Sequence, residues 1–431
     1  MNRPPITEVL KERLLYFDGA MGTMVQKRGL EAGEAPEVFS LSHPDVITDI
    51  HKRYLDAGAN IITANTFGAN AHKLASTGLT PDEVVAASVT LARKAAGERA
   101  YVALDIGPIG ELLEPMGTLS FEEAYEQFKE QAIAGERSGA DLALIETMSD
   151  LYEIKAAVLA VKENTKLPVF ATLTVEENGR TFTGCDMEAF AVLAESLGVC
   201  AIGLNCSLGP VQMLPHVKRL TGLTSLPVIF QPNAGLPHVI NGTVSYDITP
   251  EQFGTCQHEA ATAGVSIIGG CCGTTPDYIA EAVRQTDGLP MPKRSKDFSP
   301  RLCVPTAAVP FSEKTVIANL EDPNKNETLK ECYHCNDASE LINLALDAAD
   351  EGAEVFCINT AVPGIDEISM METAVKEVQT LCRLPLLLSA SSPEALEAGL
   401  RCVNGRAAVS IPNREDFCAV AKKYGAVIQY R

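Results

Sequence analysis

The stretch Ser266-Ile-Ile-Gly-Gly-Cys-Cys-Gly-Thr-Thr-Pro276 joins a short apolar run to a glycine-rich turn that carries two adjacent cysteines. A second run, Ala201-Ile-Gly-Leu-Asn205, ends in the same manner and is followed by Cys206. Apolar runs of this length that stop at Gly, Asn or Asp are typical of buried β-strands entering a loop. The two runs therefore predict strands that deliver cysteine side chains to their carboxyl ends.

Runs of this kind recur along the first 290 residues, with amphipathic segments between most of them. One such segment, Phe121–Ile133, is apolar at helical spacing and follows Ser120, a residue suited to cap a helix. Eight βα units in about 290 residues predict an α/β fold, a closed (βα)8 TIM barrel, whose typical size is ~250 residues. The predicted strands are residues 15–19, 61–65, 101–105, 142–146, 169–173, 201–205, 228–231 and 266–269.

An open, doubly wound sheet is the alternative fold. It would usually carry a glycine-rich nucleotide loop after its first strand, and the chain has neither a G-x-G-x-x-G nor a Walker pattern. Polar residues or cysteine end or follow six of the apolar runs, and in a barrel all these positions meet at the catalytic face. These residues are Asp18, Asn65, Asp105, Glu146, Asn205 and Cys271.

The remainder of the chain predicts a second, smaller domain. After the barrel at 1–290, residues 291–314 are rich in proline, carry the basic cluster Lys293-Arg-Ser-Lys296 and are expected to form a linker. Apolar runs separated by amphipathic segments occur again over 315–431, but they supply only five strands, so we expect a partial (half) βα barrel. Its open edge would need cover from the first barrel or from a partner, for example in a homodimer. The five strands are predicted at residues 314–318, 355–359, 385–388, 407–410 and 425–429.

Composition narrows the class of protein. The formal net charge of -21 argues against nucleic acid or an anionic membrane as a partner, because both select for basic patches. No apolar stretch is long enough to span a bilayer, and the first residues lack the apolar core of a signal peptide. The 13 cysteines have no framework spacing, which indicates free thiols or metal ligands in a reducing cytoplasm.

The three cysteines at strand ends predict a metal site. Consecutive cysteines on an ideal strand point to opposite faces, so Cys271 and Cys272 must lie where the strand has become a loop, as the neighbouring glycines allow. With Cys206 they can hold a zinc ion and leave its fourth position open, which is the arrangement of a catalytic zinc site. The alternative is that each is a small buried core residue, a common fate of free cysteine. Their joint placement favours the metal.

Six motifs in residues 1–290 resemble, in order, those of the homocysteine S-methyltransferase family, in particular the homocysteine-binding module of cobalamin-dependent methionine synthases. The resemblance implies a (βα)8 barrel in which Cys206, Cys271 and Cys272 bind zinc and the homocysteine sulfur takes the fourth position. It implies transfer of a methyl group to that thiol, which forms methionine. The motifs are Asp18-Gly-Ala-Met-Gly-Thr23, Ala64-Asn-Thr-Phe-Gly-Ala-Asn70, Asp105-Ile-Gly-Pro-Ile-Gly110, Ile145-Glu-Thr147, Gly203-Leu-Asn-Cys206 and Gly269-Gly-Cys-Cys-Gly-Thr-Thr275.

An amino-acid substrate needs acceptors for its ammonium and donors for its carboxylate. Asp18 and Glu146 suit the ammonium, and the glycine loop ending at Gly22 and Thr23 offers backbone amides to the carboxylate. On the residues alone, Asp18 could equally be a turn residue and Glu146 a solvated loop charge. The resemblance assigns Asp18, Gly22, Thr23 and Glu146 to homocysteine. No further catalytic side chain is assigned, and several strand-end asparagines could simply tie loops together, namely Asn65, Asn70, Asn205 and Asn233.

Residues from about 315 resemble the pterin-binding domain of corrinoid methyltransferases, but they depart from it where pterin is bound. The resemblance predicts acidic or amide residues at three positions where this chain instead has Cys357, Ser389 and Ser410. The opening strand also lacks the Glu-Arg-Ile-Asn pattern of that domain. We therefore expect folate not to bind. The carrying residues are Ile358-Asn-Thr-Ala-Val-Pro-Gly-Ile-Asp-Glu367, Ser392-Pro-Glu-Ala-Leu-Glu-Ala-Gly-Leu400 and Ala421-Lys-Lys-Tyr-Gly425.

The methyl donor stays open between two kinds of molecule. The chain has no Asp-x-His-x-x-Gly, the pattern of corrinoid-binding domains, so methylcobalamin or another methylcorrinoid would be supplied by a separate protein. S-methylmethionine or betaine is the alternative donor, although a betaine site would favour an aromatic cage and the chain has no Trp. A non-catalytic zinc-thiol binding or assembly subunit is the other class. The C-x-x-C at Cys332 and Cys335 has no second pair and predicts incidental thiols.

Overall fold

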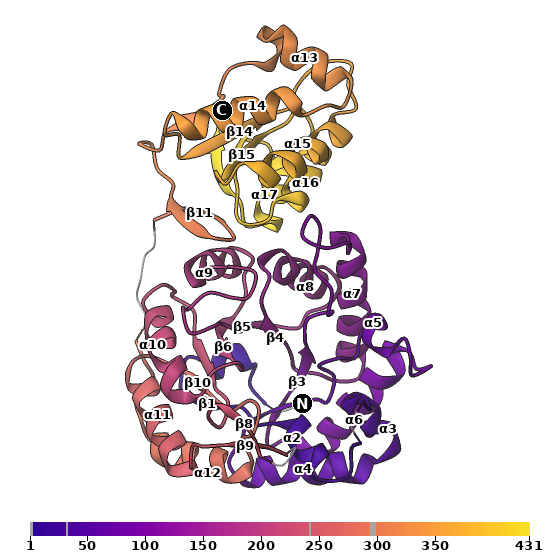
Figure 1. The fold of residues 1–431 in the computed structure, drawn as a ribbon, viewed down its shortest axis with the longest axis vertical. Helices are drawn as coiled ribbons and strands as arrows, with labels where there is room; N and C mark the ends of the chain where they lie inside the picture. The colour runs from indigo at the N-terminus through magenta and orange to yellow at the C-terminus, as the bar shows by residue number, and fades with distance from the viewer. Residues whose placement is uncertain (1–2, 32, 241–242, 294–298) are drawn as a thin grey trace. The chain divides into compact units, whose positions relative to one another are not determined.

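The computed structural model describes residues 3–31, 33–240, 243–293 and 299–431 (Figure 1). The chain divides into two compact units. The first is Met1–Met187 with Val199–Lys296, and the second is Glu188–Gly198 with Asp297–Arg431. Residues 294–298 of the expected linker, with most of its basic cluster, lie outside the described residues.

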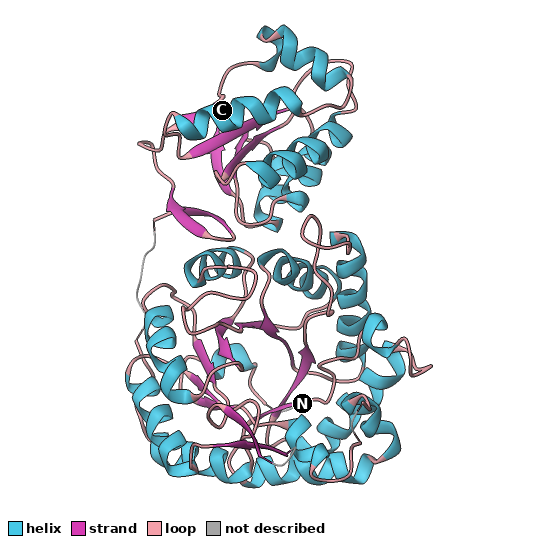
Figure 2. Ribbon diagram, viewed as in Figure 1, coloured by secondary structure: helices cyan, strands magenta, loops and turns pink. Residues whose placement is uncertain are grey.

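The first unit is a closed parallel barrel, as predicted. Its eight strands pair in the order β1-β10-β7-β6-β5-β4-β3-β2, and a bridge between Phe17 and Ile61 joins the two ends of that order. Figure 2 shows the strands ringed by helices. The strands are β1 (Leu15–Tyr16), β2 (Ile61–Thr63), β3 (Tyr101–Ile106), β4 (Leu142–Met148), β5 (Val169–Leu173), β6 (Ala201–Asn205), β7 (Val228–Gln231) and β10 (Ile267–Ile268).

Three helices of the barrel begin with a reciprocal pair of capping hydrogen bonds. Thr80, Ser120 and Thr249 each accept a hydrogen bond from the third residue of the helix that follows, and a Glu or Gln there returns the bond. The helix predicted after Ser120 is confirmed as α7 (Phe121–Arg137). The others are α1 (Ile6–Val9), α2 (Met21–Gln26), α3 (Phe39–Ser42), α4 (Pro44–Asp56), α5 (Ala71–Leu74), α6 (Pro81–Ala96), α8 (Leu151–Asn164), α10 (Pro210–Thr221), α11 (Pro250–Thr262) and α12 (Pro276–Thr286), with a 3-10 turn at Pro36–Val38.

Alternate residues of each strand fill the barrel interior. The apolar ones form one buried cluster: Leu15, Phe17, Ile61, Tyr101, Ala103, Leu142, Leu144, Phe170, Ala201, Ile229 and Ile267. Full burial of a Leu, Ile or Phe side chain contributes about 1.5–3 kcal/mol each. Continued alternation places polar residues at the last interior positions, so the carboxyl end of the barrel is polar. These residues are Thr63, Asp105, Glu146, Thr172, Asn205 and Gln231.

A hairpin that the sequence analysis did not predict follows β7. Its strands, β8 (Pro237–Ile240) and β9 (Thr243–Tyr246), pair antiparallel before α11. Ile248 and Ala234, which flank the hairpin, are joined by a backbone hydrogen bond of 3.2 Å. The hairpin therefore leaves the barrel wall and returns to it at nearly the same place, next to the loop that carries Cys272.

The second unit is built on five parallel strands in the order β13-β14-β15-β16-β17, as the sequence predicted. They are β13 (Ile317–Ala318), β14 (Val355–Asn359), β15 (Leu386–Ser389), β16 (Ala408–Ile411) and β17 (Val427–Tyr430). The helices are α13 (Glu327–His334), α14 (Ser339–Asp350), α15 (Glu367–Leu381), α16 (Pro393–Cys402) and α17 (Glu415–Lys423), with a 3-10 turn at Pro323–Lys325; α9 (Met187–Ser196) lies mostly in the segment that groups with this unit.

The segment expected as a linker contains a second hairpin. Its strands, β11 (Arg301–Val304) and β12 (Ala307–Pro310), pair antiparallel, and Cys303 bridges to Arg406. Leu302 of this hairpin and Phe311, which follows it, are buried against one face of the five-stranded sheet. The hairpin therefore packs against apolar residues of β14, β15 and β16 that an incomplete barrel would otherwise leave open.

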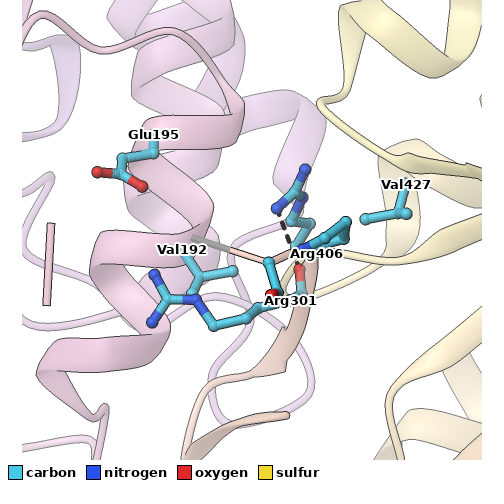
Figure 3. Close-up of a pocket in the computed structure, with 7 residues that line it drawn as sticks. Val192, Glu195, Arg301, Arg406 and Val427 are labelled. Atoms are coloured by element: carbon cyan, nitrogen blue, oxygen red, sulfur yellow. Dashed lines mark hydrogen bonds between the residues drawn. The ribbon is translucent and has the colours of Figure 1, made fainter. Parts of the chain in front are cut away.

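The second unit also holds a small pocket of about 220 Å³ (Figure 3). Arg301 and Arg406 line it, and the Arg406 guanidinium donates to the Arg301 carbonyl at 3.1 Å and to the Gly425 carbonyl at 2.7 Å. Arg301 in turn donates to Glu188 at 2.9 Å. Both guanidiniums therefore take part in bonds that hold the hairpin to its neighbours. Within the described parts of the chain, no helix has the length and apolarity needed to cross a membrane.

Candidate metal and substrate site

Three cysteine thiols converge at the carboxyl end of the barrel. The Sγ atoms of Cys206, Cys271 and Cys272 all lie within 4.8 Å of one another, and those of Cys206 and Cys272 are 3.9 Å apart. Tetrahedral zinc with Zn–S bonds of about 2.3 Å needs sulfur atoms about 3.8 Å apart. The three thiols thus fit a zinc ion in donor type and spacing, and they leave one position for another ligand.

Unusual backbone conformations hold the first thiol. Cys206 and Ser207 have φ of 58° and 54°, the left-handed region that residues other than glycine seldom adopt. The Cys206 N–H donates to the Gln231 carbonyl at 3.1 Å, and the Ser207 hydroxyl donates to the Val175 carbonyl. Backbone of this kind costs about 1–3 kcal/mol and persists where surrounding bonds impose it. The turn directs the Cys206 thiol to the other two.

Glycines bring the cysteine pair close to its neighbours. A Cβ at Gly270 would lie 2.3 Å from the Thr274 hydroxyl oxygen, and one at Gly273 would lie 2.3 Å from the Tyr246 ring. Gly273 also has φ of 82°. The Cys271 N–H donates to the Pro232 carbonyl at 2.9 Å, which ties the loop after β10 to the loop after β7.

The three thiols share hydrogen bonds in the metal-free protein. Bonds from Cys206 and then Cys271 lower the pKa of Cys272 to about 3, whereas the bond with Cys206 raises the pKa of Cys271 well above its usual value. The shared bonds therefore favour the ionised form of Cys272 over that of Cys271. A cation at the centre would allow the other two thiols to ionise as well.

Acidic side chains lie at the ends of two other strands, β1 beside β10 and β4 two strands from β6. Asp18, directly after β1, accepts from the Thr63 N–H at 2.9 Å and from the Thr63 hydroxyl at 2.7 Å. Burial, opposed by these bonds, raises the pKa of Asp18 to about 7. Burial also raises the pKa of Glu146 to about 8, with smaller contributions from Cys206 and Asp18. The carboxyls of Asp18 and Glu146 therefore share the barrel mouth with the thiols.

The proposed carboxylate-binding residues lie in a different local structure from the one expected. Gly22 and Thr23 belong to the first turn of the helix α2, so the expected loop is shorter. The Thr23 hydroxyl accepts from the Gly273 N–H at 3.1 Å, which links α2 to the cysteine loop. Open space surrounds the position that a Cβ at Gly22 would take, whereas one at Gly19 would clash with Thr274. This turn therefore lies beside the cysteine loop, with open space next to Gly22.

Asn205, the last residue of β6, is hydrogen-bonded to residues of β4 and β5. Its Oδ1 accepts from the Thr147 N–H at 2.9 Å and the Thr172 hydroxyl at 2.8 Å, while its Nδ2 donates to the Thr147 hydroxyl and lies 4.0 Å from Cys271 Sγ. The other asparagines differ. Asn65 donates to the Pro36 carbonyl, Asn70 caps α5, and Asn233 Oδ1 is buried without a hydrogen-bond partner in the described structure.

Tyr246 is a site residue that the sequence analysis missed. It ends β9, its ring lies against Gly273, and burial followed by the nearby Cys272 thiol raises its pKa to about 12. The pair Asn241-Gly242 in the sequence predicts a hairpin here, but nothing local predicts that the hairpin brings Tyr246 to the cysteine loop. The C-x-x-C cysteines are different: Cys332 and Cys335 are free thiols and are not part of the three-cysteine group.

Comparison with known proteins identifies the family. Residues 15–286, which include all three cysteines, match the homocysteine S-methyltransferase family. The chain belongs to this family. Over 436 aligned residues, 95% of this chain, it is 31% identical to the methionine synthase of Mycobacterium tuberculosis, and it is 31% identical to that of Mycobacterium leprae over 441 residues.

Solved structures of the family share the barrel. The homocysteine methyltransferase MmuM from Escherichia coli in its oxidised form has a TM-score of 0.57 and 26% sequence identity, and covers 66% of this chain and 100% of its own. The metallated form of MmuM has the same TM-score and 25% identity. The chain spans 36% of the length of the two methionine synthases.

Proposed function

We propose that this chain transfers a methyl group to the thiol of homocysteine, forming methionine, in a zinc-dependent reaction. The observation that supports it most is the pairing of two clusters across one barrel mouth. Cys206, Cys271 and Cys272 occupy the ends of β6 and β10, and the buried carboxyls of Asp18 and Glu146 occupy the ends of β1 and β4. An amino acid with a terminal thiol has complementary groups at its two ends.

We assign the residues of the site to substrate binding and to metal binding. Asp18 and Glu146 would accept hydrogen bonds from the α-ammonium, and the backbone amides at Gly22 and Thr23 would donate to the α-carboxylate. Cys206, Cys271 and Cys272 would hold the zinc. When bound, zinc lowers the pKa of the substrate thiol and holds the thiolate in place. With three thiolates from the chain holding the metal, a substrate sulfur bound there would stay electron-rich and would suit attack on a methyl carbon.

The methyl transfer itself exchanges one bond for another. The substrate sulfur forms a bond to the methyl carbon while the bond from that carbon to its carrier breaks, and the carrier leaves with the electron pair. We propose a methylcorrinoid such as methylcobalamin as the carrier, held by a separate protein. The similarity to methionine synthases, of which this chain spans only part, supports that choice.

The second unit lacks acidic partners for a pterin at the positions where the family resemblance expects them. Cys357 faces the covered side of the sheet within an apolar cluster, and burial raises its pKa to about 12, so it offers no negative charge. The Ser389 hydroxyl accepts from the Arg431 guanidinium at 2.7 Å. We propose that folate does not bind here. Isothermal titration with methyltetrahydrofolate would show no heat of binding; a saturable signal would contradict the proposal.

We further propose that the second unit forms a homodimer through its sheet edges. Val316 and Leu320 flank the edge strand β13 and are 55% and 60% exposed, and Tyr430 on β17 is 58% exposed. Sedimentation of the full chain would give a dimer, and Leu320→Lys would shift it to a monomer. A monomeric wild-type chain would refute this proposal. We also propose a reducing, cytoplasmic location, which 13 cysteines without a framework spacing support.

The decisive experiment is methionine formation by the full chain. Zinc-loaded protein is incubated with homocysteine and methylcobalamin, then stripped with a chelator and reloaded. We expect methionine before stripping, none after it, and recovery on reloading. Zinc-replete protein that makes no methionine from methylcobalamin, S-methylmethionine or betaine would refute methyl transfer and favour a zinc-thiol binding protein.

A further inference from the structure

One buried carboxyl at the barrel mouth has no role in the function proposed above. Asp105 ends the interior row of β3 and is 6% exposed. Its backbone is fully engaged: the N–H donates to the Thr66 hydroxyl at 3.0 Å, and its carbonyl accepts from the same hydroxyl at 2.8 Å. Its Oδ1, in contrast, is buried without a hydrogen-bond partner in the described structure. A buried acceptor without a hydrogen-bond donor is unfavourable, because it has lost its hydration and gained no partner.

The direction of this side chain follows from the alternation of β3. Tyr101 and Ala103 belong to the cluster that fills the barrel interior. Leu104 points the other way, since a Cβ on Gly135 of α7 would lie 2.5 Å from a Leu104 methyl carbon. Asp105 therefore faces the interior, in the strand between Thr63, which holds Asp18, and Glu146.

The charges around Asp105 are mostly negative. Burial, then the carboxylates of Glu146, Asp18 and Glu37, raise its pKa well above the usual value, and Lys73 alone opposes them. The Lys73 ammonium donates to the Pro108 carbonyl at 2.7 Å and lies 4.9 Å from the Phe67 ring centre. One lysine with its own partners leaves the three mouth carboxyls short of positive charge, and Asp105 Oδ1 has no hydrogen-bond donor in the described structure.

We propose that Asp105 is a third carboxylate of the amino-acid site, which receives the α-ammonium of the substrate together with Asp18 and Glu146. This inference rests on the proposed function, because it concerns the same substrate. An ammonium group supplies three N–H donors and one positive charge, which match three acceptors on the strands β1, β3 and β4. Asp105 then makes the site selective for thiols that carry an ammonium over thiols of the same length that lack one.

Binding to the zinc-loaded full chain tests this selectivity. Isothermal titration compares L-homocysteine with 4-mercaptobutanoate, which keeps the thiol and the carboxylate but has no ammonium. In Asp105→Asn we expect affinity for L-homocysteine to fall at least tenfold and affinity for 4-mercaptobutanoate to change less than twofold. The charge control is Asp56→Asn, whose carboxylate is 71% exposed on α4 and which should leave both affinities unchanged. Asp105→Ser serves if the asparagine variant does not fold.

Each outcome bears on a different statement. An equal loss for both ligands in Asp105→Asn would indicate a general structural role and overturn the inference, and so would unchanged binding of L-homocysteine. Equal affinity of the wild-type chain for both ligands would also overturn it. Wild-type protein that binds L-homocysteine with this selectivity but forms no methionine would instead refute the proposed reaction and leave the role of Asp105 standing.

Discussion

Asn205 Oδ1 accepts a hydrogen bond of 2.9 Å from the backbone N–H of Thr147, and each of these residues adjoins a different part of the site. Asn205 precedes the metal-binding candidate Cys206, and Thr147 follows the substrate-binding candidate Glu146. Thr147 also has φ of 60°, so its backbone is held in a conformation that the bond to Asn205 stabilises. A single amide thus joins the strand that leads to Cys206 to the strand that carries Glu146.

Removing this amide should loosen the metal site. For Asn205→Ala we expect zinc affinity to fall about 10–100-fold, the effect typical of residues that orient metal ligands. Competition with a chromogenic chelator measures the affinity. The matched control is Asn164→Ala, because Asn164 also donates two side-chain bonds but at the end of α8. Zinc affinity equal to that of the wild-type chain would show that Asn205 does not orient the thiols.

Loss of any one of the three thiols should abolish stoichiometric zinc binding. For Cys206→Ala we expect bound zinc to fall from one ion per chain to none. We expect the rate of methionine formation to fall on the order of 10³-fold, which corresponds to an increase of about 4 kcal/mol in the activation free energy. Metal analysis after gel filtration measures the first quantity. Cys256→Ala, which removes a half-buried thiol on α11, should change neither. Full zinc occupancy in Cys206→Ala would contradict the assignment.

The buried carboxyl of Asp18 should make the substrate-free, metal-free protein less stable as pH rises. Its folded pKa is about 7 against 3.8 for the ordinary group, so the native state holds the extra proton between these values. Stability is therefore lost as pH rises from about 4 to 7, by up to about 4 kcal/mol for this group. Thermal unfolding of Asp18→Asn should show a flatter profile over that range. Parallel profiles for variant and wild type would disprove the linkage.

His51 should make the protein sensitive to acid. It is fully buried on α4, both ring nitrogens lack partners in the described structure, and burial lowers its pKa to about 4 from 6.5. The unfolded chain takes up the proton first, so stability is lost as pH falls from about 6.5 to 4, by about 3 kcal/mol. His51→Leu should remove this loss in urea titrations, whereas the exposed His43→Gln should retain it. An unchanged acid profile in His51→Leu would contradict this account.

Gly273 should tolerate no side chain because two costs coincide there. Gly273→Ala would strain a φ of 82° and drive a methyl group into the Tyr246 ring, whereas Gly139→Ala meets the first cost alone, with φ of 95° and open space. We expect Gly139→Ala to cost about 1 kcal/mol and Gly273→Ala clearly more, with weaker zinc binding. Chemical unfolding and metal titration measure both. Equal costs would show that Tyr246 yields freely.

Local sequence signals were sufficient for much of this fold. Apolar runs that end at polar or glycine residues marked the eight barrel strands and the five strands of the second unit, because a buried parallel strand needs an unbroken apolar stretch. The same signals placed Cys206, Cys271 and Cys272 at strand ends, and closure of the barrel then brings those ends together. The helix after Ser120 followed from its cap and its spacing.

Other features depended on contacts between distant parts of the chain. The hairpin that brings Tyr246 to Gly273 carries a turn signal in the sequence, Asn241-Gly242 between two short runs, which the sequence analysis did not use; the contact of Tyr246 with Gly273 depends on packing. The bonds of Asn205 cross from β6 to β4 and β5, and the unpaired Oδ1 of Asp105 becomes visible only when every neighbour is placed. The sequence analysis predicted a linker where the hairpin β11–β12 lies, because the two strands are short and prolines flank them. The burial of this hairpin against the sheet depends on tertiary packing.

The sequence by itself determined the barrel, the order of its strands and the identity of the three thiols, since periodicity and residue chemistry are local properties. The tertiary structure decided which side chains meet: the thiols with one another, Asn205 with Thr147, and Asp105 with the carboxyls beside it. These relationships arise from burial and from hydrogen-bond pairing. Both depend on contacts between residues that are tens to hundreds of positions apart in the sequence.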